Sequence, residues 1–309
     1  MNQRLKADAA LALCTLVWGA TFVVVKGALE HASVFAFMAV RFTLAALLMA
    51  VIYRRALRRL TCGEVWAGAQ IGFFMFTGYA FQTRGLLYTT PSKAAFITGS
   101  GVVLVPVLMA LFWGRRIHRW VWAGALAALL GLYYLTVPPA GFARLHRGDL
   151  LVAVCAVLFA LHIIFVGRYT LHHSVAALSF LQVATTAVLT VVALPVLAAT
   201  GWEPPRLDWN ASLLAAVLIT AVLATAAAFS VQVWAQQYTT PTHTAILFSL
   251  EPVFAALTSY LVVRERLGRR ALLGAALILL GILLAELKGP TQAAADSPGP
   301  VTESPEPGS

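Results

Sequence analysis

The chain consists of long apolar blocks joined by short polar connections. Residues 9–28, 65–81 and 271–285 are examples of nearly uninterrupted apolar sequence. A helix needs about 20 such residues to cross a bilayer. Soluble helices of this length would show polar faces at helical spacing, and these blocks do not. Only 11% of the residues are charged, against roughly 25% in soluble domains. The pattern predicts an all-α integral membrane protein.

Basic residues lie in short clusters between the apolar blocks, and the net charge is +10. Clusters of this kind are typical of loops that flank membrane helices. They do not form a basic face, so we expect no nucleic-acid partner. The three cysteines lie far apart and have no metal-ligand spacing, so we expect no metal and no cofactor. The basic clusters are Arg54, Arg55, Arg58 and Arg59; Arg115, Arg116 and Arg119; and Arg264, Arg266, Arg269 and Arg270.

The apolar blocks predict ten membrane-spanning helices. The first block is longer than a signal-peptide core and is interpreted as a retained helix. Residues 289–309 contain five prolines and few large apolar side chains, so we expect a disordered tail. The expected spans are 9–28, 33–53, 65–87, 92–113, 120–137, 149–168, 174–199, 211–236, 242–263 and 270–287.

The sequence repeats itself. The run YTTP begins at Tyr88 and again at Tyr238, and an offset of 150 aligns 82–137 with 232–287 without a gap. Upstream, an offset of 141 aligns Asp8 with Asp149 and Arg41 with Gln182. The chain therefore contains two copies, 8–137 and 148–287, with five expected helices each. An odd number of helices turns the second copy upside down, which predicts an inverted repeat.

The repeated motifs have structural interpretations. Proline fits the first turn of a helix, so Pro91 and Pro241 are expected to begin the fourth and ninth helices. Threonine before each proline can cap the helix. Two glycines seven residues apart recur in the last helix of each copy, and small residues allow close helix packing in membranes. These glycines are Gly124 and Gly131, then Gly274 and Gly281.

The arginine clusters also predict an orientation. With the N-terminus inside, the loops that hold the first seven clustered arginines are cytoplasmic, as the positive-inside rule requires. The last loop of the second copy is basic as well, although an inverted copy places it outside. The first copy is expected to dominate. We therefore expect a multi-pass protein of the cytoplasmic membrane with both termini in the cytoplasm.

Polar side chains within the spans are the candidate functional residues. An ionised group at a helix centre costs about 2.5–3.5 kcal/mol on insertion scales, so it usually faces a cavity or a partner. Arg41 and Glu251 are the most central; a structural ion pair between helices is the alternative interpretation for both. Deep aromatic residues could form a substrate-facing wall or simply pack. The candidates for substrate binding or coupling are Arg41, Glu251, Arg84, Gln82, Trp18, His162, Gln182 and Trp234.

Glu251 has two ways to avoid the cost of an isolated charge. It can pair with a cation such as Arg41 or Arg84, or it can stay protonated in an apolar site. Pairing is favoured because cations outnumber carboxylates within the spans. A protonated Glu251 would instead allow coupling to a proton gradient. Pro252 follows directly and frees a backbone carbonyl one turn back, which predicts a bend at this depth.

Several segments resemble one family. LVWGATFVVVK at 16–26, the mid-helix Arg41 and the segment 81–108 resemble the first EamA-type repeat of the drug/metabolite transporter superfamily. SLEPVFAALTSYLVVRERL at 249–267 and GAALILLGILLAE at 274–286 resemble the second. The resemblance implies ten helices and transport of small metabolites or drugs. Residues 11–25 hold no carboxylate, unlike the first helix of smaller multidrug relatives.

These observations favour a secondary active transporter that works by alternating access. Its expected partners are a small-molecule substrate and the bilayer; proton coupling is left open, as is the choice between monomer and homodimer. The alternatives are a membrane enzyme acting on lipid or peptide, and a membrane receptor that does not transport. An enzyme would need a nucleophile and a base at one depth. The run TGSG at 98–101 offers Ser100 but no evident base, so we expect no enzyme.

Overall fold

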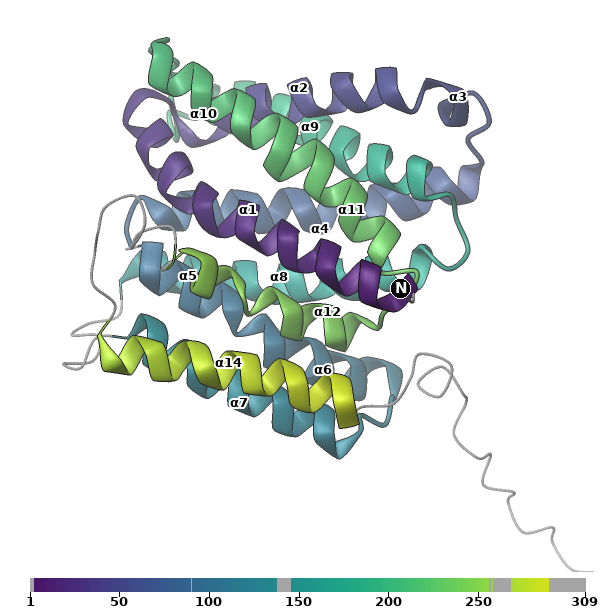
Figure 1. Cartoon of the computed structure of the whole chain (residues 1–309). Helices are drawn as coiled ribbons and strands as arrows, with labels where there is room; N and C mark the ends of the chain where they lie inside the picture. The colour runs from purple at the N-terminus through teal and green to yellow at the C-terminus, as the bar shows by residue number, and fades with distance from the viewer. Residues whose placement is uncertain (1–2, 90, 138–145, 256, 258–267, 289–309) are drawn as a thin grey trace, which may run out of the picture.

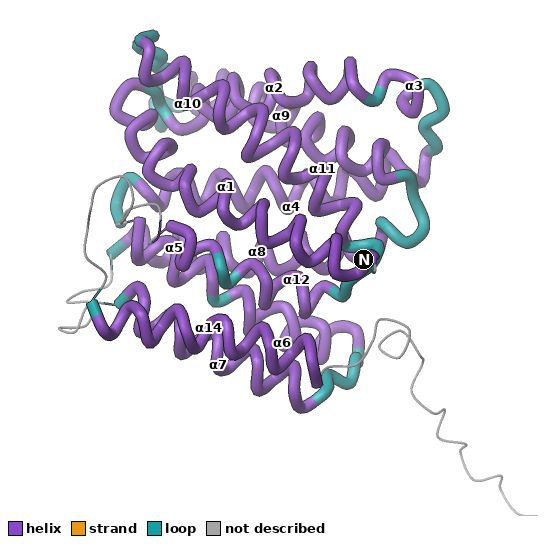
Figure 2. The backbone as a smooth tube through the Cα atoms, in the orientation of Figure 1, coloured by secondary structure: helices purple, strands orange, loops and turns teal. Residues whose placement is uncertain are grey.

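The structure, a computed structural model, describes residues 3–89, 91–137, 146–255, 257 and 268–288. These residues are helices joined by short loops and contain no strand (Figures 1 and 2). The helices are α1 (Gln3–His31), α2 (Val34–Ile52), α3 (Arg54–Leu57), α4 (Cys62–Leu86), α5 (Pro91–Gly99), α6 (Gly101–Trp113), α7 (Arg119–Thr136), α8 (Arg147–Tyr169), α9 (Val175–Ala199), α10 (Ala211–Ala221), the π-helix η1 (Val222–Ala227), α11 (Ala228–Ala235), α12 (Pro241–Phe248) and α14 (Arg269–Lys288).

Within the described residues, six helical segments are long and apolar enough to cross a membrane. They are Gln3–His31, Val34–Ile52, Ala94–Trp113, Arg147–Tyr169, Val175–Ala199 and Ala211–Ala235. The all-α membrane prediction is therefore confirmed at this level. The expected span 242–263 lies partly outside the described residues, and the expected tail 289–309 lies wholly outside them.

Capping residues set several helix boundaries. Thr61 and Glu64 form a reciprocal capping box at the start of α4, and the Asn210 side chain accepts a hydrogen bond from the Leu213 N–H at 2.8 Å. Thr240 caps α12, whose first residue is Pro241. Helix α5 begins at Pro91. Both prolines therefore begin helices, as predicted from the repeat.

The glycines of α7 and α14 pack against one another. A Cβ on Gly124 would lie 2.6 Å from the carbonyl oxygen of Gly281, and one on Gly131 would lie 2.6 Å from that of Gly274. The first contact joins the start of α7 to the end of α14, and the second joins the reverse ends. The helices therefore run antiparallel, side by side (Figure 1). Close packing at these glycines is confirmed.

The chain's fourth and ninth expected spans are interrupted at matching places. In the first copy, α5 gives way to α6 at Ser100, whose hydroxyl donates to the Ile97 carbonyl at 2.6 Å. In the second copy, α12 ends at Phe248, and Ser249 donates to the Ile246 carbonyl at 2.6 Å. Helix resumes at residue 251, one turn after Phe248. This interruption lies where Pro252 lacks the N–H that would bond to Phe248.

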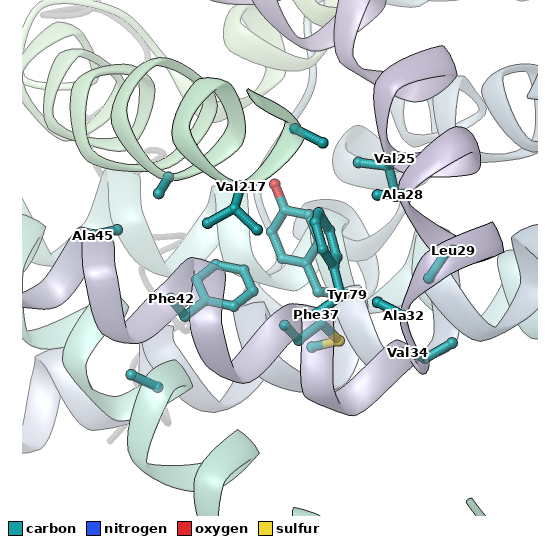
Figure 3. Close-up of a cluster of buried hydrophobic side chains, with 14 of the residues drawn as sticks. Val25, Ala28, Leu29, Ala32, Val34, Phe37, Phe42, Ala45, Tyr79 and Val217 are labelled. Atoms are coloured by element: carbon teal, nitrogen blue, oxygen red, sulfur yellow. The ribbon is translucent and has the colours of Figure 1, made fainter. Parts of the chain in front are cut away.

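The largest apolar cluster lies where α1, α2, α4 and α10 meet. Phe37, Phe42 and Tyr79 contribute aromatic rings to it, and Val217 of α10 packs beside them (Figure 3). Phe42 and Tyr79 pack edge to face with ring centroids 5.1 Å apart. The cluster therefore packs against one side of the Tyr79 ring. Tyr79 also lines the cavity described below.

Candidate functional site

A cavity with about 930 Å³ of empty space, part of it open to solvent, lies between helices of both sequence copies. Residues of α1, α4, α8 and α11 line it, together with residues next to the interruptions at Ser100 and Ser249. An interrupted helix leaves backbone groups free for a ligand, and such helices border the substrate sites of many transporters. The cavity is therefore the candidate functional site of the described chain.

Repeat-equivalent residues of both copies line this cavity. Seven pairs contribute both of their members to its lining, although they are more than 140 residues apart in sequence. At an offset of 141 the pairs are Trp18 and Phe159, Thr21 and His162, and Phe22 and Ile163; at an offset of 150 they are Tyr79 and Phe229, Gln82 and Gln232, Thr98 and Phe248, and Gly101 and Glu251. Aromatic rings are shared between the copies, whereas charged groups are not.

Arg41 supplies the cationic side of the cavity. It is buried on α2, and its Nε donates a hydrogen bond to Thr225 Oγ1 at 2.9 Å. Its guanidinium carbon lies 5.0 Å from the Phe42 ring centre and 4.8 Å from that of Tyr79. No carboxylate in the described part of the chain forms an ion pair with it. A cation stabilised by rings and a hydroxyl keeps its charge available to an anionic ligand group.

Glu251 supplies a carboxylate on another wall. It follows the interruption at Ser249, and its backbone carbonyl lies close to Gly19 of α1, where a Cβ would be 2.5 Å from that oxygen. Among the residues that the structure describes, it forms no ion pair with Arg41 or Arg84. The pairing favoured from the sequence is therefore not found. The local cause is that Arg41 bonds to Thr225 and Arg84 to Glu203.

The two equivalent glutamines have different partners. Gln82 Nε2 lies 3.4 Å from Thr98 Oγ1, at the edge of hydrogen-bond range. Gln232 Nε2 donates to Gln236 Oε1 at 3.0 Å, which leaves Gln232 Oε1 buried without a partner among the described residues. A buried acceptor of this kind at a cavity wall is suited to a donor from a ligand or from water.

His162 lines the cavity, and Gln182 lies behind it. Their side chains are fully buried and approach at 2.9 Å, from His162 Nε2 to Gln182 Oε1. Gln182 does not itself line the cavity, so the equivalents Arg41 and Gln182 do not occupy matching positions in its wall. Gln182 instead orients the imidazole of His162.

Trp18 lines the cavity, whereas Arg84 and Trp234 lie outside its wall. Trp18 Nε1 donates to the Ala224 carbonyl at 2.9 Å, and its ring packs on Phe229 and Phe248. Trp234 packs on Tyr238 with ring centroids 5.5 Å apart. Arg84 forms an ion pair with Glu203 and lies next to the lining residue Thr83.

The π-helix η1 and Glu203 were not identified from the sequence. Trp18 and Arg41 both bond to η1, at Ala224 and Thr225. An apolar run such as VLATAA gives no sign of π-helical hydrogen bonding. Glu203 lies in a loop beside Pro204 and Pro205, so its sequence context predicts only a turn.

Two other expectations concern chemistry. The described residues contain no group of three or more histidine, cysteine, aspartate or glutamate side chains that could hold a metal. Ser100, between α5 and α6, donates its hydroxyl to the Ile97 carbonyl of α5 and does not line the cavity. In this arrangement the hydroxyl is bonded to a backbone carbonyl, and no side-chain base in the described part of the chain accepts its proton.

Comparisons with known proteins identify a transporter family and transporter relatives. The model of the EamA-like transporter family matches residues 5–137 and 146–287. An uncharacterized transporter of Archaeoglobus fulgidus is 36% identical over 286 residues, which is 93% of this chain and 87% of that protein. A second one from the same organism is 26% identical over 92% of this chain and 98% of its own length.

A solved crystal structure of a protein shares the fold. Its TM-score is 0.73 at 18% sequence identity, over 94% of this chain and 99% of that one. At this sequence identity the similarity shows a shared arrangement of helices and does not show a shared ligand. The overall helix arrangement is therefore one that experiment has already seen in another chain.

Proposed function

Because the chain belongs to the EamA-like transporter family of the drug/metabolite transporter superfamily, and is thus a membrane transporter, we propose that it is a secondary active transporter for a small organic solute. The observation that carries the proposal is the cavity lined by repeat-equivalent residues of both copies. Inverted repeats place equivalent helices on the two sides of a site that lies on the axis between them. Such a site can open to either side of the membrane through equivalent helix movements, which is what alternating access requires.

The proposed architecture is ten helices in two inverted repeats, 8–137 and 148–287. The antiparallel contact between α7 and α14 supports it, because these helices are equivalent in sequence. Two equivalent helices that lie antiparallel across a common contact are related by a two-fold axis through that contact. The seven equivalent pairs around the cavity fit the same axis.

The bodies that move are not the two copies themselves. Helix α4 of the first copy packs on α8 and α9 of the second, with Gly85 against Gly148 and Gly72 against Thr185. Helix α1 packs on η1 and α11, with Trp18 bonded to Ala224. We name these two sets the α4 group and the α1 group. The cavity lies between them, so rocking of one group against the other would expose it alternately.

The cavity wall also favours a substrate class. Arg41 is a buried cation with no carboxylate partner in the described chain, and Glu251 and Gln232 offer acceptors on other walls. An anionic or zwitterionic solute with an apolar body would satisfy Arg41 and contact the aromatic rings. Glu251 would bind a cationic part of the solute, or carry a proton as access alternates.

The proposed setting is the cytoplasmic membrane, with both termini in the cytoplasm, as the arginine clusters of the first copy favour. The test is a substrate screen with purified protein in liposomes, with and without a pH gradient. Uptake of acidic or zwitterionic solutes above protein-free liposomes supports the proposal. The absence of uptake for every solute class, with protein shown to be folded and inserted, would overturn it.

A further inference from the structure

The cavity has two ends, and different contacts hold each of them closed if the chain is a transporter as proposed above. One end, where α1 finishes at His31, is named the His31 face; the other, where α1 begins at Gln3, is named the Gln3 face. In Figure 1 these faces are the left and right sides of the view. The lining residues Val25, Thr83 and Leu86 mark the part of the cavity nearest the His31 face.

A strap crosses the His31 face. It consists of residues 200–208, between α9 and α10, and it is fixed to the end of α1 by backbone hydrogen bonds. The Ser33 N–H donates to Arg206 O at 2.9 Å, and the Asp208 N–H donates to His31 O at 2.8 Å. The Arg206 side chain adds a hydrogen bond to Glu30 O at 2.8 Å. The strap is therefore tied to the end of α1 through residues 206 and 208, and to α9 through the N–H groups of Trp202 and Glu203, which donate to Leu197 O at 3.0 and 3.3 Å.

Charged contacts join this strap and α1 to the end of α4. Arg84 of α4 forms an ion pair with Glu203 of the strap and lies 5.4 Å from the ring centre of Trp202. Glu203 also accepts a hydrogen bond from the Phe35 N–H at 2.8 Å. Lys26 of α1 donates to the Leu86 carbonyl of α4. The Lys26 contact joins the α1 group to the α4 group directly, and the Arg84–Glu203 pair joins α4 to the strap, which is itself bonded to the end of α1.

The equivalent contacts at the Gln3 face are neutral. The equivalents of Lys26, Arg84 and Leu86 are Gly167, Trp234 and Gln236. There, Gln236 Nε2 donates to Ile163 O at 3.0 Å. Gln237 Nε2 donates to Thr170 O at 3.0 Å, and the Thr170 hydroxyl donates to Val233 O at 2.8 Å. At these equivalent positions the Gln3 face thus has amides and a hydroxyl where the His31 face has charged side chains.

We propose that the Arg84–Glu203 ion pair is a latch that holds the cavity closed at the His31 face, with Lys26 as a second point of closure. The side chains are mostly buried, with 24% of Arg84 and 8% of Glu203 exposed, so separating them moves charge out of a favourable contact. At the Gln3 face the equivalent positions are joined by neutral hydrogen bonds, and the contact there between His243 Nε2 and Asp8 Oδ1, at 3.4 Å, joins α12 to α1. The two ends are therefore opened by different contacts, although the helices that form them are equivalent.

The reporter for the test is a single cysteine in the cavity. Gly101 lines the cavity, and a Cβ added there meets nothing within 4 Å, so Gly101→Cys introduces a thiol without a clash. Cys14, Cys62 and Cys155 are replaced by alanine in the full chain. The protein is reconstituted in vesicles, and labelling by a membrane-impermeant maleimide is timed from each side. An exposed Glu30→Cys identifies the side of the His31 face.

Arg84→Gln and Glu203→Gln should each speed labelling from the His31 face about tenfold, which is about 1.4 kcal/mol of lost closure. A glutamine at position 203 keeps a side-chain oxygen that can accept the hydrogen bond from the Phe35 N–H. Glu203→Gln therefore removes the charge and preserves this hydrogen bond. The double variant should be no faster than either single variant, because both remove one interaction. Arg84→Lys should stay slow. Gln237→Ala, at the other end, should not speed labelling from the His31 face.

Unchanged labelling in both single variants would overturn the latch. Multiplied effects in the double variant would overturn it as well, because they would mean that Arg84 and Glu203 act separately. Labelling needs no identified substrate, so the latch and the transport function fail independently. Faster labelling without any solute uptake would keep the latch and reject transport. Solute uptake with unchanged labelling would keep transport and reject the latch.

Discussion

Gly131 and Gly274 lie backbone against backbone where α7 crosses α14. A Cβ added to either residue would be 2.6 Å from the carbonyl oxygen of the other. The relationship is reciprocal because the two helices are equivalent in sequence and antiparallel in space. The crossing also fixes how closely the last helices of the two copies approach, since no side chain separates them.

Gly131→Ala should destabilise the protein. The new methyl group would meet a backbone oxygen that cannot move aside, and overpacking of this kind costs about 1–3 kcal/mol. Gly27→Ala is the matched control, because an added Cβ there meets nothing within 4 Å and alanine favours the helix by up to about 1 kcal/mol. Thermal unfolding in detergent measures both. An equal melting temperature for Gly131→Ala and Gly27→Ala would contradict the close crossing.

The glycine spacing predicted close packing, but it did not predict which glycines meet. Equivalent residues are Gly131 and Gly281, whereas the contacting pairs are Gly131 with Gly274 and Gly124 with Gly281. Each glycine contacts the non-equivalent glycine of the other helix because the two helices run antiparallel. The proline positions also predicted the starts of α5 and α12, because a proline in the first turn acts locally.

The parts that were not predicted depend on distant residues. Arg84 and Glu203 are 119 positions apart, and the loop around Glu203 has no signal that names its partner. Arg41 forms its hydrogen bond with Thr225 and not with Glu251 because the π-helix η1 places Thr225 beside it. An apolar run gives no sign of π-helical hydrogen bonding. The order of helices around the cavity likewise comes from packing between copies, since α4 packs on α8 and α9.

Arg41→Gln should reduce transport of acidic and zwitterionic solutes at least tenfold while the protein remains in the membrane. The variant removes the buried cation that lies 4.8 Å from the Tyr79 ring. Arg41→Lys keeps the charge but loses the Nε contact with Thr225, so an intermediate rate is expected. Uptake into liposomes, normalised to inserted protein, gives the comparison. Equal uptake of these solutes by all three proteins would remove Arg41 from the site.

Glu251→Gln and Glu251→Ala separate proton coupling from a structural role. If Glu251 carries a proton, the glutamine variant should keep uptake but lose its dependence on a pH gradient. The alanine variant should lose both, because it also opens space beside the cavity. Uptake by the glutamine variant that still follows the pH gradient would exclude Glu251 as the coupling group. Loss of both variants from the membrane would make it a structural residue.

Cysteine labelling at two basic loops tests the inverted repeat. Arg58→Cys follows α3, and Arg266→Cys is in the last basic cluster, outside the described residues. Five helices per copy place these loops on opposite sides of the membrane. An impermeant reagent added to intact cells should therefore label position 266 and not position 58. Labelling of both positions from the same side would contradict the inversion.

Two-sided access to Gly101→Cys tests the central claim most directly. The cysteine would lie in the cavity, which its repeat equivalent Glu251 also lines, in a protein without other cysteines. Alternating access predicts that an impermeant maleimide reaches it from either side of the vesicle membrane, and that a transported solute slows both reactions. Labelling from one side only, with and without every solute that binds, would contradict the account.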